Sequence, residues 1–111
     1  MIHEMKLNPL PFEQIVAGEK TIEYRLWDKK RRLLNIGDKI VFTNLEDRKQ
    51  IEVIVKAIHK ALSFAELYTY LLSKKIICED QFDPNVMYDY YSKEDEQKYG
   101  VVGIEIVLVK G

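Results

Sequence analysis

A nearly unbroken run of β-branched and other apolar residues occupies the end of the sequence, from Val101 to Val109. A strand with one face in water alternates apolar and polar residues, whereas a strand buried on both faces has no need to. This run therefore predicts a central strand of a sheet. The chain must then supply strands on both sides of it.

Four other segments have the alternating pattern that predicts strands of this sheet. They are Ile2–Leu7, Thr21–Trp27, Lys39–Asn44 and Gln50–Ala57, the last of which can extend to His59. The short polar segment Leu45–Arg48 predicts a hairpin loop between the third and fourth of them.

Capping signals between the strands predict short helices. A helix is expected over Pro11–Ala17, because proline suits a first helical turn. Ser63 and Glu66 form the capping pattern of a longer helix, whose last turn would hold Lys74 and Lys75. Similar signals predict two more helices, one from Asp83-Pro84 to Tyr91 and one from Ser92 to Lys98. The predicted fold class is α+β, a small mixed β-barrel of about five to six strands with short helices packed around it.

The length of 111 residues predicts a single domain over residues 1–111. With 47% hydrophobic and 32% charged residues, the chain has enough apolar surface for a core and enough charge to stay in solution. Cys78 is the only cysteine, which excludes an intramolecular disulfide and favours the reducing cytoplasm. The sequence has neither a secretory leader pattern nor a run of about 20 apolar residues, so no membrane partner is expected.

The net charge of −1 hides an asymmetry, since residues 1–60 carry +3 and residues 61–111 carry −4. The positive excess is concentrated directly after Trp27. An aromatic side chain beside cations is the combination with which proteins bind single-stranded nucleic acid, so Trp27 is a candidate for stacking on a base. The candidate phosphate contacts are Lys29, Lys30, Arg31 and Arg32. The alternative is that these four residues form an ordinary solvated surface.

The turn and strand over Gly18–Arg25 bring three charged side chains close together. Lys20 lies in the turn, and Glu23 and Arg25 fall on one face of the strand. Opposite charges in this arrangement change each other's pKa and can hold an anionic or hydrogen-bonding ligand. The alternative is a solvated strand face whose surface ion pairs contribute little to stability.

Other chemistry-bearing residues lack the neighbours that their chemistry needs. His3 and His59 have no partners at metal-binding spacing, so neither a metal nor a cofactor is expected. Cys78 has no visible base beside it, which favours an unreactive thiol. Tyr88 and Tyr91 lie at helical spacing, which is typical of core packing. The chain has no phosphate-binding glycine loop, dinucleotide fingerprint or nucleophile elbow.

Four segments carry recognisable motifs in a fixed order: Pro11–Ile15, Gly18–Arg25, Ile36–Phe42 and Tyr99–Ile106. The last three contain the patterns G-x-K-T-I-E-x-R, G-D-x-I-x-F and Y-G-V-x-x-I-x-I, which are fairly specific in combination. Together they resemble the ASCH domain family over nearly the whole chain, and in particular its small stand-alone bacterial and archaeal members. The resemblance implies a PUA-like β-barrel, related to folds that bind RNA or modified nucleotides in a cleft.

Small members of this family include amidohydrolases that remove the acetyl group from 4-acetylcytidine. Their machinery is a lysine in the turn, a threonine three residues later and a more distant glutamate. Lys20 matches the lysine, but Glu23 stands at the threonine position and Thr21 follows the lysine directly, on the opposite phase of the strand. Glu66 and Glu79 are candidates for the later glutamate.

The resemblance implies that the chain binds RNA, a nucleoside or a nucleotide in a cleft beside Gly18–Arg25. The expected ligand-binding residues are Lys20, Thr21, Glu23, Arg25, Trp27 and Tyr99. The alternative is a metal-independent hydrolase of the same site with Lys20 and Glu23 as catalytic residues, either an amidohydrolase that activates water or a single-strand ribonuclease that also uses Arg25. In a third hypothesis, the turn only builds the barrel.

Overall fold

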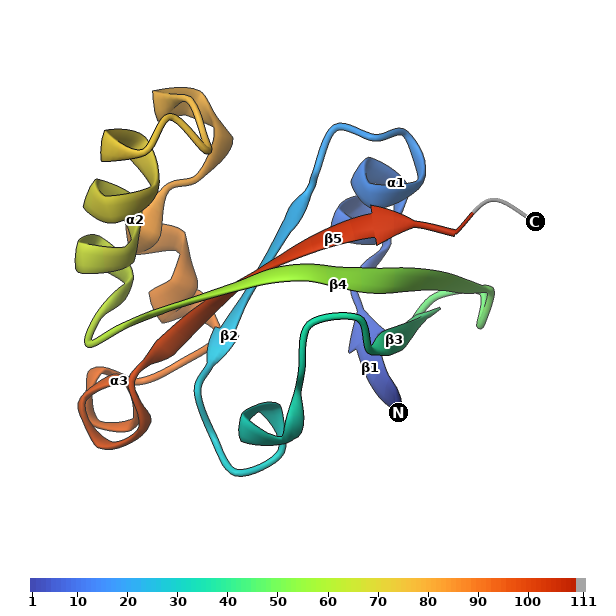
Figure 1. The fold of residues 1–111 in the computed structure, drawn as a ribbon, viewed down its shortest axis with the longest axis horizontal. Helices are drawn as coiled ribbons and strands as arrows, with labels where there is room; N and C mark the ends of the chain where they lie inside the picture. The colour runs from blue at the N-terminus through green and yellow to red at the C-terminus, as the bar shows by residue number, and fades with distance from the viewer. Residues whose placement is uncertain (110–111) are drawn as a thin grey trace. The chain divides into compact units, whose positions relative to one another are not determined.

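The computed structural model describes residues 1–109 and shows an α+β fold with a five-stranded mixed sheet (Figure 1). Strand β1 is parallel to β3, and β3 is antiparallel to β4. The order across the sheet is β1-β3-β4-β5-β2. The strands are β1 (Ile2–Leu7), β2 (Ile22–Leu26), β3 (Lys39–Asn44), β4 (Gln50–Ala61) and β5 (Val101–Leu108). The predicted fold class is therefore confirmed.

Strand β5 is an interior strand, as its composition predicts, because it lies between β4 and β2. The side chains of Val101, Val102 and Ile104 are fully buried. Val107 is half exposed, so burial on both faces is confined to the first part of the strand.

Strands β1 and β3 show how period-two patterning positions a strand. His3, Met5 and Leu7 of β1 are buried, and the residues between them are exposed. His3 pairs with Ile40 and Met5 with Phe42, which are also buried. A slip of one residue would expose all these side chains, so the pattern fixes the register.

Three α-helices, α1 (Pro9–Val16), α2 (Phe64–Ser73) and α3 (Lys93–Tyr99), connect the strands. Helix α1 begins two residues before the predicted start, because Pro9 also suits a first turn. The Ser63 hydroxyl caps α2 by accepting a hydrogen bond from the Glu66 N–H at 3.1 Å, as predicted. Ser92 caps α3 in the same way.

Several predicted boundaries are wrong. Helix α2 ends at Ser73, so Lys74 and Lys75 lie beyond its last turn, and Lys75 has a left-handed φ of 56° that ends the helix. The helix predicted up to Tyr91 is a shorter 3₁₀ helix, η3 (Pro84–Asp89). Strand β4 runs two residues past His59. The remaining 3₁₀ helices are η1 (Arg31–Leu33) and η2 (Glu79–Gln81).

Gly100 connects α3 to β5 with a φ of 73°, a conformation that glycine adopts without strain. A Cβ at this position would lie 3.1 Å from the carbonyl oxygen of Ala61. Both the backbone angle and the space therefore favour glycine here, directly after the last residue of α3.

The chain divides into two compact units, and strands β2, β4 and β5 contribute residues to both. The first unit comprises residues 1–23, 34–58 and the segment from 104 onward, and the second comprises residues 24–33 and 59–103. In the second unit, α2 lies beside η3, drawn in orange in Figure 1. The core of the first unit includes Met5, Phe12, Ile40, Phe42, Val53 and Ile104, and that of the second includes Leu26, Phe64, Leu67, Leu71, Val101 and Val102.

Candidate functional site

Lys20 and Glu23, the two predicted catalytic residues, form an ion pair in the first unit. Lys20 ends the turn after α1, where the N–H groups of Glu19 and Lys20 both donate to the carbonyl oxygen of Gln14. Gly18 adopts a positive φ of 77° in this turn. The turn brings Lys20 Nζ to 3.2 Å from Glu23 Oε1.

Glu23 is buried, with only 4% of its surface exposed. Ile22, Tyr24 and Leu26, on the opposite face of β2, are buried too. Arg25, on the same face as Glu23, is half-buried, so the charged residues of this face are not fully solvated as the alternative hypothesis expected. The Lys20 side chain is 22% exposed. A buried carboxylate needs a cation or hydrogen-bond donors, and Lys20 supplies a cation that is also in contact with solvent.

Thr21 and Arg25 are two further predicted ligand contacts, the first between Lys20 and Glu23 in the sequence and the second two residues after Glu23. Thr21 is exposed, and its carbonyl oxygen accepts a hydrogen bond from the Ile106 N–H at 2.9 Å. Its backbone therefore helps to hold the start of β2. Arg25 is half-buried on β2 and belongs to the second unit.

Hydrogen bonds to backbone groups link the segments of Trp27 and Tyr99, the predicted aromatic contacts, in the second unit. The Trp27 N–H donates to the carbonyl oxygen of Gly100 at 2.9 Å. Arg32 donates from Nε to the Trp27 carbonyl oxygen at 2.8 Å and from Nη2 to the Tyr99 carbonyl oxygen at 3.1 Å. One guanidinium thus joins the end of β2 to the end of α3.

Cations also lie over both aromatic rings. Arg32 Cζ is 5.8 Å and Lys60 Nζ is 5.4 Å from the centroid of the Trp27 ring. Lys98 Nζ is 5.1 Å from the centroid of the Tyr99 ring. These are cation–π distances. Lys60 and Lys98 were not among the predicted residues, because neither lies in a basic run.

The four predicted phosphate contacts differ in their surroundings. Lys29 and Lys30 are exposed. Arg31 forms an ion pair with Asp28 at 3.3 Å, and its backbone N–H donates to the same carboxylate. Arg31 Nε is buried without a hydrogen-bond partner. Arg32 uses two donors on backbone carbonyls, as described above, so the predicted set divides into two exposed lysines and two arginines with internal contacts.

Asp38 and His3 form a buried polar pair that the sequence analysis did not predict. His3 Nε2 lies 2.8 Å from Asp38 Oδ2, and the Asn35 N–H donates to the same oxygen at 3.0 Å. The hydrogen bond with His3, followed by that from Asn35, holds the pKa of Asp38 below its usual value. Asp38 was visible in the sequence as part of the G-D-x-I-x-F pattern, but its partner His3 on β1 has no local pattern that points to it.

Glu96 is a second buried carboxylate that sequence reasoning missed. One oxygen accepts the Phe64 N–H at 2.8 Å, and both lie 2.9 Å from the Tyr88 hydroxyl, which donates. Glu96 thus caps α2 from another helix. Burial, followed by the hydrogen bond to Glu96, raises the pKa of Tyr88. Tyr88 and Tyr91 both pack against Phe64, as their spacing predicts.

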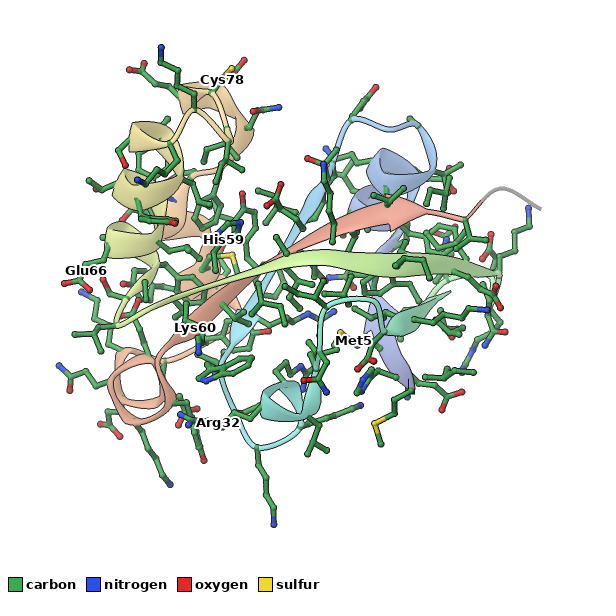
Figure 2. All side chains as sticks on the ribbon, viewed as in Figure 1. Met5, Arg32, His59, Lys60, Glu66 and Cys78 are labelled. Atoms are coloured by element: carbon green, nitrogen blue, oxygen red, sulfur yellow. The ribbon has the colours of Figure 1, made fainter. Side chains whose placement is uncertain are left out.

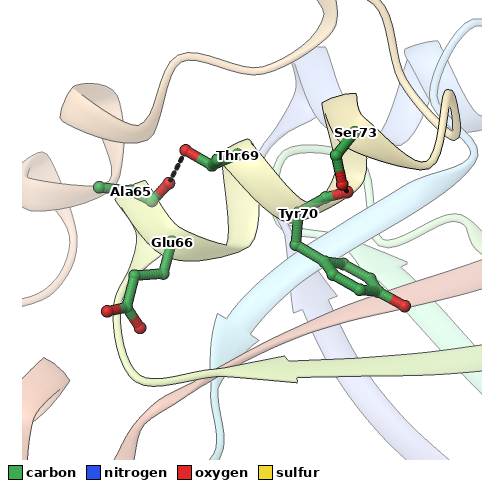
Figure 3. Close-up of a pocket in the computed structure, with 5 residues that line it drawn as sticks. All are labelled: Ala65, Glu66, Thr69, Tyr70 and Ser73. Atoms are coloured by element: carbon green, nitrogen blue, oxygen red, sulfur yellow. Dashed lines mark hydrogen bonds between the residues drawn. The ribbon is translucent and has the colours of Figure 1, made fainter.

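A pocket of ≈ 370 Å³ lies on α2 (Figure 3). It is lined by Ala65, Glu66, Thr69, Tyr70 and Ser73. Glu66, a candidate for the distant glutamate of the amidohydrolases, is exposed at its rim. Cys78 is exposed as well.

Residues 1–109 contain neither a candidate metal site nor a helix that could span a membrane. No group of three His, Cys, Asp or Glu side chains in this range is arranged to hold a metal ion. Every described helix is too short or too polar to cross a membrane.

Comparison with known proteins gives a family and several solved structures. The family model for the ASCH domain matches residues 5–110. The hypothetical protein PH0355 is 37% identical and aligns over 98% of this chain and 100% of its own, with a TM-score of 0.78. Protein PF0455 from Pyrococcus furiosus is 35% identical over 100% of both chains, with a TM-score of 0.70.

A more distant structure shares the fold alone. ASCH from Zymomonas mobilis is 17% identical over 96% of this chain and 66% of its own, with a TM-score of 0.65. No match was found among curated proteins.

Proposed function

Because the chain belongs to the ASCH domain family, we propose that it binds RNA or a modified nucleoside beside Lys20, Thr21 and Glu23. The supporting observation is the Lys20–Glu23 pair at 3.2 Å, in which the carboxylate is buried and the ammonium contacts solvent. An ammonium can donate to a phosphate or a base oxygen, and a carboxylate can accept from an exocyclic amino group. In the second unit, Arg25, Trp27 and Tyr99 are proposed as a separate set of ligand contacts.

The same ion pair supports a second candidate function, a metal-independent hydrolase. Glu23 would take a proton from the attacking water, and Lys20 would stabilise the negative charge that develops on the attacked carbonyl or phosphate. The protonated Glu23 would then give this proton to the leaving amine or alkoxide as the C–N or P–O bond breaks. Glu23 replaces the threonine nucleophile of the amidohydrolases, so water is the nucleophile in this proposal. The substrate would be a nucleoside amide such as 4-acetylcytidine, or single-stranded RNA.

The experiment that tests both candidates is a chemical-shift titration of the ¹⁵N-labelled chain. The ligands are short single-stranded RNAs and free nucleosides, including 4-acetylcytidine, and each sample is analysed by chromatography afterwards. Shifts clustered at Gly18–Arg25 without product support a binding protein. The same shifts with product support the hydrolase, and no shifts with any ligand contradict both.

Lys39 offers a matched control for Lys20. Its ammonium lies 3.2 Å from Glu52, the same separation as in the Lys20–Glu23 pair, but Glu52 is 47% exposed. Lys20→Met is expected to abolish the shifts or the turnover, and Lys39→Met to leave them unchanged. Glu23→Gln is a second variant at the same site, and the amide spectrum of each free variant reports whether it is folded. Equal effects of Lys20→Met and Lys39→Met would contradict a specific role for Lys20.

We also propose that residues 1–111 form one ASCH domain that works in the cytoplasm. The family model leaves out only a few residues at the ends of the chain. An exposed thiol at Cys78 is compatible with a reducing compartment.

A further inference from the structure

We propose that Trp27 is a stacking platform for a base of single-stranded RNA, and that Lys60 covers this platform until the RNA binds. This inference rests on the proposed function and assigns part of it to residues of the second unit alone. The residues concerned, called the Trp27 surface below, are Trp27, Arg32, Lys60, Lys98 and Tyr99.

The backbone around Trp27 is held on both sides of the residue. Its N–H donates to Gly100, and its carbonyl oxygen accepts from Arg32 Nε at 2.8 Å. The other end of the guanidinium is held by the Tyr99 carbonyl oxygen. The indole is half-buried and therefore has a supported position while part of its surface meets solvent. An aromatic ring fixed in this way loses little conformational entropy when a base stacks on it.

Arg32 is part of this support. With Nε and Nη2 both donating to backbone carbonyls, its guanidinium has a defined place over the ring. We therefore assign Arg32 a positioning role in place of the phosphate contact expected from the sequence. Breaking either bond would leave a carbonyl oxygen without this donor.

Lys60 differs from Arg32 although both contact the same ring. Its side chain is exposed, and its ammonium lies 5.4 Å from the ring centroid without a hydrogen bond or ion pair to any described residue. Figure 2 shows Lys60 near the end of β4 and Arg32 in the connection that follows β2. An exposed cation–π contact is weaker than base stacking, so a base can displace the ammonium. The flexible lysine stem then keeps the charge within reach of the phosphate of that nucleotide.

The charges around the Trp27 surface favour a nucleic acid over other partners. Lys98, like Lys60, places an exposed ammonium over an aromatic ring, and Lys29 and Lys30 are exposed nearby in the sequence. The one acidic residue of the 27–32 connection, Asp28, is paired with Arg31. Rings interleaved with cations match the alternation of bases and phosphates in a single strand.

The chain is well suited to a direct test, because Trp27 is its only tryptophan. The full chain is titrated with a single-stranded adenylate hexamer, and tryptophan emission is followed with the unlabelled RNA. Binding is measured independently by the anisotropy of a fluorescein-labelled hexamer at several salt concentrations. We expect the emission to be quenched with the same affinity that the anisotropy reports.

Two variants identify the residues. Lys60→Met is expected to lower the slope of log affinity against log salt by about 0.7, the value for one phosphate contact to a single strand. Lys74→Met is the matched control, because Lys74 also lies over a ring, that of Tyr70, at 6.0 Å. It is expected to leave the slope unchanged. Trp27→Leu, checked for folding by circular dichroism, should weaken binding at least about fivefold.

The possible failures are distinguishable. A rise in anisotropy without quenching, or equal slopes for Lys60→Met and Lys74→Met, would overturn the Trp27 platform and leave RNA binding elsewhere on the chain intact. No rise in anisotropy with any single strand would overturn RNA binding itself.

Discussion

His3 Nε2 on β1 lies 2.8 Å from Asp38 Oδ2 in the turn before β3, which links two segments 35 residues apart in the sequence. The carboxylate also accepts the Asn35 N–H, so it holds both the turn and the neighbouring strand.

This pair predicts a loss of stability in acid. The pKa of Asp38 is lowered in the folded chain, so its contribution is complete above the unfolded value of about 3.9 and is lost as the pH falls through the folded value. Asp38→Asn should reduce stability near neutral pH and flatten its dependence on pH below about 4. Urea unfolding between neutral and acid pH measures both effects, with the exposed Asp89→Asn as control. Identical acid dependence in wild type and Asp38→Asn would refute the prediction.

Glu96 should contribute to stability through its contacts with Phe64 and Tyr88. Glu96→Gln keeps the size of the side chain but replaces one acceptor oxygen with an NH₂ group. Since the Phe64 N–H and the Tyr88 hydroxyl would then bond a neutral amide in place of a charged acceptor, the variant is expected to lose about 1–3 kcal/mol of unfolding free energy. Glu94→Gln, an exposed residue in the first turn of the same helix, should change it by less than about 0.5 kcal/mol. Chemical denaturation of both variants tests this, and equal losses would contradict it.

Tyr88 should ionise at a higher pH than an ordinary tyrosine. Burial and the Glu96 carboxylate both disfavour the phenolate, so the pKa of Tyr88 is raised above 10.0. The neutral form stabilises the fold below the unfolded pKa, and this contribution is lost as the pH rises through the folded pKa. Ultraviolet difference titration of wild type against Tyr88→Phe isolates this residue from the other tyrosines. Glu96→Gln should lower the pKa of Tyr88, and an unchanged value would show that the carboxylate is not involved.

The Lys20–Glu23 and Lys39–Glu52 ion pairs should differ in their contribution to stability. Lys20→Met leaves the Glu23 carboxylate buried without this cation, whereas Lys39→Met leaves Glu52 in contact with solvent. The first variant is expected to lose roughly 1–3 kcal/mol, a value reduced for the partial exposure of Lys20, and the second less than about 1 kcal/mol. Thermal and urea unfolding of both variants gives the difference. A larger loss for Lys39→Met would contradict the burial argument.

Local patterns were sufficient to predict much of this fold. Strands β1 and β3 begin and end at the residues that alternation predicts, because an apolar face repeats every second residue. Ser63 and Ser92 cap their helices, because a cap depends on residues only three positions away. The helix C-terminus near Lys75 was missed, because a lysine with positive φ has no compositional signal.

The candidate site was harder to predict, because its environment depends on residues far apart in the sequence. The Lys20–Glu23 pair spans three positions and was expected, but the burial of Glu23 depends on tertiary packing. Arg32 contacts the carbonyl of Tyr99, 67 residues away, and Lys60 contacts the ring of Trp27, which is 33 residues away in the sequence (60 − 27). Neither contact has a local pattern, so Arg32 was expected to bind phosphate and Lys60 was not considered.

Gly100 contacts two segments that are distant from it in the sequence, at Trp27 and at Ala61. Its carbonyl oxygen holds the Trp27 N–H, and its missing side chain leaves room for the Ala61 carbonyl. In a library that varies every position, residue 100 should therefore tolerate almost nothing but glycine, while positions 60 and 98 should accept many side chains without loss of folding. Substitutions at positions 60 and 98 can then change the charge around the Trp27 and Tyr99 rings, and with it the preferred ligand, while the Gly100 backbone that holds Trp27 stays the same.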